Sequence, residues 1–128
     1  MEKKAVISPK APRPVGPYSQ AIEAGDLIFL SGQVGIDPQT NRMKEGGVKE
    51  QAAQALKNLT GVLQVMGLDL SAVVKMTVFL VDMKDFPELN GVYAEYFTDS
   101  PPARSCVAVR ELPLGALVEM EAIAVKTR

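Results

Sequence analysis

Hydrophobic residues recur at helical spacing in two stretches of the chain. From Val48 to Met66 they fall three and four positions apart along one stripe, and Gly67 follows as a C-terminal cap. A second helix is expected from Asp85 to about Phe97, because a capping aspartate, a proline in the first turn and Glu88 at the third helical position precede an apolar face. The first helix is expected to cover a sheet, with its Leu and Met stripe in the core.

Runs rich in β-branched residues predict the strands of that sheet. They are Ser19 to Glu23, Leu27 to Val34, Val73 to Val81, Ser105 to Val109 and Leu117 to Lys126. Ala24-Gly25-Asp26 joins the first two as an antiparallel hairpin, and local reasoning pairs the last two in the same way. The Val73 strand is apolar on both faces, which is typical of a central strand in a sheet covered on both sides. Residues 1–17 form an extended surface arm with a short strand around Ala5 to Ile7.

Length and composition limit the function classes. A chain of 128 residues with 47% hydrophobic content can build one compact core, so residues 1–128 are expected to form a single domain. The formal charge of −1 comes from 14 basic and 15 acidic residues without long runs, which makes nucleic acid an unlikely partner. One cysteine and no long apolar span predict a cytoplasmic protein with no disulfide and no membrane association.

The absence of histidine decides which chemistry is open. Imidazole bases, Ser-His and Cys-His pairs and the commonest zinc ligand are all missing. Catalysis must therefore use carboxylates, arginine, tyrosine, backbone groups and water. Cys106 has no base to form a thiolate, so we interpret its thiol as a small buried packing group.

Arg104 follows two prolines that force an extended chain, so it lies at the mouth of the fourth strand. Alternation places Arg104, Cys106 and Ala108 on one, partly apolar face. A guanidinium in that setting favours a planar carboxylate, which it can bind through two parallel hydrogen bonds. An internal salt bridge to one of the acidic residues is the alternative, and this stretch alone does not separate the two.

Three other residues have both a structural and a ligand-binding interpretation. Tyr18 follows the stiff Gly16-Pro17 turn, and taken alone it is expected to cap the core. Gly32, inside a strand, marks either a bulge or a place where a ligand approaches the backbone. Asn90 shares the apolar face of the second helix, so its amide needs partners, which could be structural or a ligand.

The last strand carries two acidic residues on an apolar face. Glu119 and Glu121 alternate with that strand's other side chains and lie beside Leu117 and Ile123. At least one carboxylate is therefore expected either to pair with Arg104 or a lysine, or to have a raised pKa, as a water-activating base does.

Taken together, five motifs resemble the RidA (YjgF/YER057c) family. They are Gly16-Pro17-Tyr18-Ser19-Gln20-Ala21, Ser31-Gly32-Gln33, Asp85-Phe86 to Asn90, Pro102-Ala103-Arg104-Ser105 and Glu119-Met120-Glu121-Ala122. The resemblance implies an α+β fold similar to trimeric chorismate mutase: a mixed sheet with two helices packed on one face, assembled as a homotrimer with sites between subunits. It also implies that the final strand lies between the Leu27 and Val73 strands, leaving the Arg104 strand at an edge.

The resemblance further implies a deaminase without metal or cofactor. Its substrates are 2-enamino and 2-imino acids formed by pyridoxal-phosphate-dependent serine and threonine dehydratases, and its products are 2-oxo acids and ammonia. By motif position, Arg104 pairs with the substrate carboxylate and Glu121 activates water. The residues implied to contact the substrate are Tyr18, Ser31, Gly32, Asn90 and Cys106, with Gly32 and Cys106 using backbone groups. Relatives described as ribonucleases, translation inhibitors or chaperone-like ligand binders define the other function classes.

Overall fold

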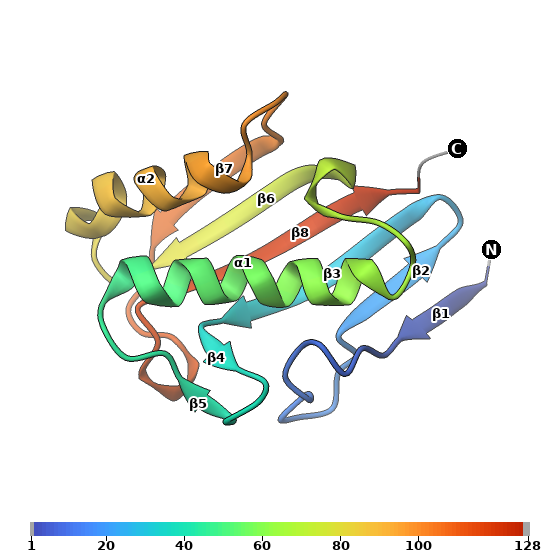
Figure 1. Ribbon diagram of the computed structural model, residues 1–128, viewed down its shortest axis with the longest axis horizontal. Helices are drawn as coiled ribbons and strands as arrows, with labels where there is room; N and C mark the ends of the chain where they lie inside the picture. The colour runs from blue at the N-terminus through green and yellow to red at the C-terminus, as the bar shows by residue number, and fades with distance from the viewer. Residues whose placement is uncertain (1, 127–128) are drawn as a thin grey trace.

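A six-stranded mixed sheet carries both helices on one face (Figure 1). The structure is a computed structural model that describes residues 2–126. The sheet consists of β1 (Lys3–Val6), β2 (Ala21–Ala24), β3 (Leu27–Val34), β8 (Val118–Val125), β6 (Val73–Leu80) and β7 (Ala103–Ala108), in that spatial order. The helices are α1 (Val48–Gln64) and α2 (Phe86–Tyr96), and β4 (Ile36–Asp37) pairs with β5 (Arg42–Met43) as a separate small ribbon. This arrangement confirms the expected α+β class with two helices on one sheet face.

The last strand is central rather than part of a terminal hairpin. β8 pairs antiparallel with both β3 and β6, and β7 pairs parallel with the far side of β6. The placement implied by the family resemblance is therefore confirmed, and the hairpin expected from local reasoning is wrong. Side-chain burial explains the order. β8 buries Val118, Met120 and Ala124 completely under the helices, whereas most of β7 is exposed and is tolerated at an edge.

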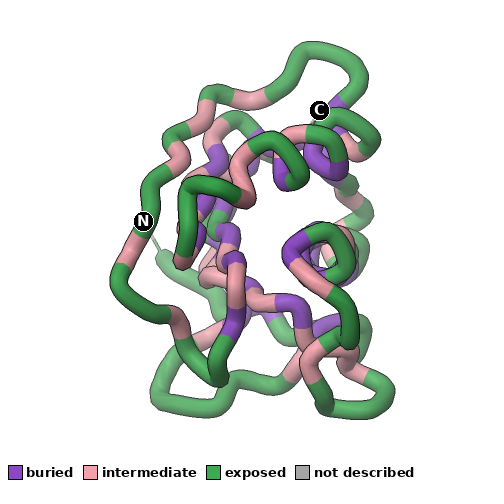
Figure 2. The backbone as a smooth tube through the Cα atoms, turned by 90° about the vertical axis from the view of Figure 1, so that its left-hand side faces the viewer, coloured by how far each residue is buried: buried purple, intermediate pink, exposed green. Residues whose placement is uncertain are grey.

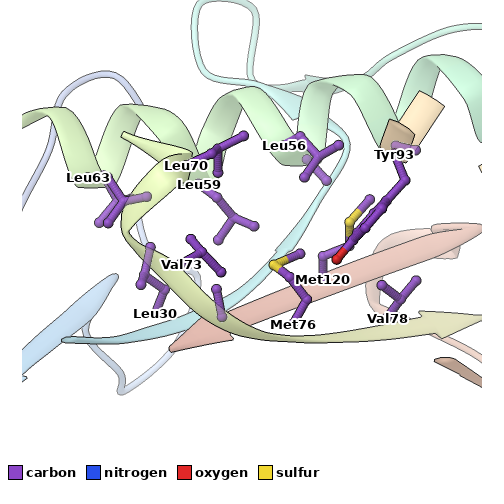
Figure 3. Packing of buried hydrophobic residues seen from close by; sticks show 14 of the residues in the cluster. Leu30, Leu56, Leu59, Leu63, Leu70, Val73, Met76, Val78, Tyr93 and Met120 are labelled. Atoms are coloured by element: carbon purple, nitrogen blue, oxygen red, sulfur yellow. The ribbon is translucent and has the colours of Figure 1, made fainter. Parts of the chain in front are cut away.

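The core fills the space between the helices and the sheet. Buried residues gather on the facing sides of these layers (Figure 2), and the α1 stripe of Leu56, Leu59 and Leu63 packs toward the sheet (Figure 3), where α1 lies against β3 and β8. Burying one such leucine contributes about 1.5–3 kcal/mol. Gly67, with φ of 72°, follows α1 as its expected C-terminal signal. Among residues 2–126, no helix has the length and apolar character needed to cross a membrane.

The opposite face of the sheet is partly apolar and is not covered by this chain. Leu27 and Phe29 of β3 and Val107 of β7 lie on it, and Phe29 is 44% exposed. Glu119 and Glu121 share this face. The sequence pattern of the Val73 strand predicted a central position in a sheet covered on both sides, but within this chain β6 lies next to the edge strand β7 and only one side of the sheet is covered.

A buried polar stripe on α1 holds the loops at one end of the sheet. Asn58 donates to the carbonyl oxygens of Val34 and Ile36 at 3.2 and 2.8 Å, and Gln51 accepts from the amide of Leu117 at 2.8 Å. These bonds satisfy backbone groups where β3 ends and β8 is about to begin. The sequence pattern of α1 predicts only an apolar stripe and does not indicate these bonds.

The start of α2 differs from the expectation. The helix begins at Phe86, but the side chain of Asp85 makes no capping hydrogen bond. A short 3-10 turn, Met83–Asp85, precedes the helix, and Asp82 caps that turn by accepting from the amide of Lys84. Asp85 is the last residue of this turn, and its backbone is already helical. Its side chain therefore does not cap α2.

The N-terminal arm is fixed by polar contacts to Gln20 and to α1. Gln20 donates to the carbonyl oxygens of Ser8 and Pro12, and the Ser8 hydroxyl donates to the carbonyl of Gly61 at 2.8 Å. Gly61 allows this approach, because a Cβ at that position would lie 2.5 Å from the carbonyl oxygen of Lys10.

We expect Gly61→Ala to lower the melting temperature, although alanine favours a helix over glycine by about 1 kcal/mol. The reason is the collision with the arm, which a backbone atom cannot avoid by rotating. Gly91→Ala in α2 is the matched control, since a Cβ there has no atom within 4 Å and should stabilise the protein. Thermal unfolding of both variants tests the packing, and equal stabilisation by both would contradict it.

Candidate functional site

The candidate site residues fall on the two opposite faces of the sheet. Arg104 lies beside Met76 in the β6–β7 register, on the helix side. Glu121 lies beside Thr77 in the β6–β8 register, on the uncovered side. Directly paired residues point to the same face, so within one chain the arginine and the carboxylate are separated by the sheet.

The first group surrounds Arg104 at the edge of the sheet. A guanidinium nitrogen of Arg104 donates to the side-chain oxygen of Asn90 at 2.9 Å. The guanidinium carbon lies 4.6 Å from the centre of the Tyr93 ring and 5.5 Å from that of Phe86, within cation–π range. Among residues 2–126, no carboxylate lies within 4.0 Å of Arg104. The internal salt bridge considered from the sequence is therefore not formed within this part of the chain.

Cys106 lies two residues further along the same face and is half-buried. Burial raises the pKa of its thiol above the usual 9.0, with the Arg104 charge acting weakly in the other direction. The thiol is therefore protonated at neutral pH, in agreement with its interpretation as a packing group. The backbone contact to a substrate implied for Cys106 stays a prediction.

The second group lines a cavity of about 390 Å³ on the other side of the sheet. Tyr18, Ser31, Gly32, Glu119 and Glu121 all contribute to it. Arg13, Pro113 and Leu114 also line it, and no motif in the sequence drew attention to these three. A larger groove of about 960 Å³ runs along the N-terminal arm and shares Tyr18, but no acidic residue lines it.

Tyr18 and Ser31 line the cavity together with residues of the N-terminal arm. Tyr18 is 48% exposed, and its hydroxyl accepts from the amide of Val15 at 3.4 Å, so the core position expected from the Gly-Pro turn alone is wrong. The turn fixes the direction of the chain, but the arm beside it leaves the ring open to solvent. The Ser31 hydroxyl donates to the carbonyl of Ser19 at 2.6 Å, which leaves its oxygen free to accept a hydrogen bond.

Gly32 and Glu119 lie close together in the lining of the cavity. The β3–β8 register shifts between Leu30 and Gln33, so the bulge, one of the two interpretations of Gly32, is present. A Cβ on Gly32 would collide with the Glu119 carboxylate. The glycine is therefore needed for the close approach of a protein carboxylate.

Glu119 is the carboxylate whose surroundings match the sequence expectation of a raised pKa. Burial raises its pKa above the usual 4.5, and the charge of Glu121 adds to the effect. Glu121 itself is exposed, and neither residue forms an ion pair within residues 2–126. The sequence showed that the two share a face, but it did not distinguish the half-buried one.

The fold and the site define a small α+β protein with a cationic half-site at the sheet edge and an acidic half-site on its uncovered face. Comparison with known proteins agrees with this class. The family model described as Endoribonuclease L-PSP matches residues 8–126. A mouse protein named 2-iminobutanoate/2-iminopropanoate deaminase is 49% identical over 124 residues, covering 97% of this chain and 92% of its own.

Solved structures give the same result. A putative endoribonuclease from Thermotoga maritima superimposes with a TM-score of 0.94 at 45% identity, covering all of both chains. Escherichia coli TdcF with bound serine gives a TM-score of 0.92 at 38% identity, covering 97% of this chain and 99% of its own. The chain belongs to the Endoribonuclease L-PSP family, which is the RidA/YjgF family that its motifs indicated.

We expect Glu119→Gln to stabilise the protein at neutral pH but not at acid pH. Because folding raises the pKa of Glu119, the parent loses stability as the pH rises from about 4.5 through the raised value. Glutamine cannot ionise and avoids that loss. Denaturant unfolding at pH 4 and pH 7 measures the difference, with Glu45→Gln as an exposed control. A stability gain that is equal at both pH values would contradict the raised pKa.

Proposed function

We propose that the protein hydrolyses 2-enamino and 2-imino acids, the reactive products of serine and threonine dehydratases, to 2-oxo acids and ammonia. The observation that carries the proposal is Arg104, a half-buried guanidinium held by Asn90 and two aromatic rings, with no carboxylate within salt-bridge distance among residues 2–126. Such a group fits a substrate carboxylate. The name of the mouse relative and the serine bound to E. coli TdcF support a small substrate derived from an amino acid.

We infer that the complete site forms between subunits of a homotrimer. Arg104 and the two glutamates lie on opposite faces of the sheet, so one small substrate cannot reach both within one chain. The uncovered face exposes Phe29 and Val107, an apolar surface that a second sheet would bury. Assembly through that face would bring the acidic half-site of one chain to the cationic half-site of its neighbour.

The chemistry follows from the groups in the two half-sites. Arg104 binds the substrate carboxylate and orients the C=N bond, while Tyr18, Ser31 and Asn90 line the pocket. A carboxylate takes a proton from water as the water oxygen bonds to the imine carbon, giving a tetrahedral carbinolamine. The proton then passes to nitrogen, the carboxylate accepts the proton of the new hydroxyl, the C–N bond breaks, and ammonia leaves as the 2-oxo acid forms. Because a protonated imine is already electrophilic, positioning and one base suffice without a metal or cofactor.

Glu119 is the better candidate for the water-activating base. The family resemblance assigned that role to Glu121, which shares the cavity but is exposed. Glu119 is half-buried, has a raised pKa and is held against the backbone at Gly32. A base whose pKa is raised toward neutrality takes a proton from water more readily. We therefore propose Glu119 as the base, with a pKa raised first by burial and further by the charge of Glu121.

The nuclease reading has weaker support in this chain. The family description and the Thermotoga structure carry the word endoribonuclease. The net charge of −1 and the two glutamates in the cavity, however, oppose binding of a phosphate backbone. A nuclease assay alongside the imine assay separates the two functions.

We expect Arg104→Ala to lower kcat/KM for imine hydrolysis by roughly ten- to a hundredfold, the loss of one charge-assisted interaction of about 1.5–3 kcal/mol. Arg104→Lys should recover only a small part, since a point charge cannot hold a carboxylate at two points. The assay couples the protein to a threonine dehydratase and follows imine loss above the spontaneous rate. Parent-like turnover in a folded Arg104→Ala variant would remove Arg104 from the site.

We expect mixed oligomers of Arg104→Ala and Glu119→Gln chains to regain activity that neither variant has alone. Random mixing at an intersubunit site gives about a quarter of parental sites with both residues intact. Light scattering should show about three times the chain mass of 13.8 kDa. Mixing Arg104→Ala with the double variant is the control, because it cannot form an intact site. Absence of recovery in verified mixed oligomers, or a monomeric mass, would contradict the shared site.

A further inference from the structure

We infer that Tyr93 is a positioning residue for the proposed deamination: the face of its buried ring fixes the guanidinium of Arg104 in the orientation that receives the substrate carboxylate. This inference rests on the proposed function and assigns a role to a core residue of α2. Tyr93 would not touch the substrate itself. It would act by limiting the conformations of Arg104.

Three side chains of α2 form a cradle around the guanidinium. Phe86, Asn90 and Tyr93 are spaced four and three residues apart, so they lie on one face of the helix. Asn90 accepts one guanidinium hydrogen, and the two rings lie against the same group at 4.6 and 5.5 Å. A single hydrogen bond leaves a guanidinium free to rotate about that bond. Contact with ring faces removes this freedom and leaves other N–H donors of Arg104 for a ligand.

Tyr93 is the rigid member of this cradle. It is 7% exposed, and its ring packs against Phe97 with centroids 4.6 Å apart. Figure 3 shows the side chain extending from α2 toward the sheet, in the direction of Met76 and Met120. Phe86 is only half-buried and lies further from the guanidinium. Because the ring of Tyr93 is held in the core, its contact with Arg104 fixes a side chain on the edge strand β7.

The hydroxyl group does not explain why a tyrosine occupies position 93. This oxygen is buried and has no hydrogen-bond partner among residues 2–126. Burial raises the pKa of Tyr93 to about 12, so the phenol stays neutral and cannot serve as a base. Burying a hydroxyl without a partner costs stability. The part of the residue with a function is then the ring face that meets Arg104.

Fixing Arg104 matters because a free arginine loses side-chain entropy when it is held in one conformation. Holding it before the substrate arrives lowers this cost at the binding step. The effect is specific to the two-point contact with a carboxylate, which requires the plane of the guanidinium to be set. Loss of the ring should therefore weaken substrate binding more than it slows the chemical step.

The test compares Tyr93→Leu, which keeps an apolar side chain but removes the ring, with Tyr93→Phe, which keeps the ring. We expect Tyr93→Leu to raise KM for the imine by about 2- to 30-fold, the range of one cation–π contact, with kcat changed less. Equilibrium binding of 2-oxobutanoate should weaken by a similar factor. Tyr93→Phe should keep KM and the affinity for 2-oxobutanoate at the parent values and should not lower the melting temperature. A loss with Tyr93→Phe equal to that with Tyr93→Leu would assign the role to the hydroxyl and overturn the inference.

Phe97→Leu is the matched control, because Phe97 is an equally buried ring near the end of α2 for which no contact with Arg104 is found. It should destabilise the fold about as much as Tyr93→Leu without raising KM. An equal rise in KM would mean that loosening of the core, and not loss of the ring face, causes the effect. If Tyr93→Leu does not fold, Tyr93→Met replaces it, since methionine fills irregular spaces.

A double variant shows whether Tyr93 acts through Arg104. In the Arg104→Lys background, Tyr93→Leu should weaken 2-oxobutanoate binding by less than about twofold further, because the group that it positions is already gone. Independent effects that multiply would overturn the inference. If the parent does not accelerate imine hydrolysis, the proposed function fails. 2-Oxobutanoate binding by the parent and by Tyr93→Leu then still decides the role of Tyr93: equal affinities, or no binding by either, would overturn the inference, and weaker binding by the variant would support it.

Discussion

The alternation of side chains along β8 is the constraint on which the rest of the structure depends. One face of this strand must be apolar, because the helix layer closes over it, and Val118, Met120 and Ala124 are completely buried there. The other face then carries Glu119 and Glu121 by necessity. The same alternation on β7 turns Arg104 toward α2. A strand shifted by one residue would bury two carboxylates in the core, so the register is strongly fixed.

This constraint links assembly to chemistry. The core forces the carboxylates and the arginine to opposite sides of one sheet, and the side with the carboxylates is also the side with unburied apolar residues such as Phe29. A surface of that kind favours association. In the proposed trimer, the contact that buries the apolar face also joins the half-sites. A fold that could not hold the whole site in one chain would thus obtain it from a neighbour.

Periodicity predicted both helices and the main strands, because burial imposes spacings of 3.6 and 2 on the sequence. Periodicity could not predict which strands pair. The pattern of β8 indicates that the strand is buried, but it does not identify the neighbouring strands. The family resemblance supplied that order. Alternation placed Glu119 and Glu121 together, but only the bulge at Gly32 distinguishes them. Helical spacing grouped Asn90 with Tyr93, whereas their contact with Arg104 depends on the β6–β7 register, which no local pattern encodes.

The proposed reaction assigns roles to two half-buried charged groups, Arg104 and Glu119, that have no ion-pair partner within residues 2–126. Glu119 is half-buried beside another carboxylate, and Arg104 is half-buried with an amide and two rings in place of an anion. Each would be more stable with an opposite charge nearby. A 2-imino acid carries a carboxylate for the arginine and a protonated nitrogen for the glutamate. Binding it between subunits would give both charges a partner at the same time. The unpaired charges that do not stabilise the folded chain would then contribute to the affinity for a substrate with this charge pattern.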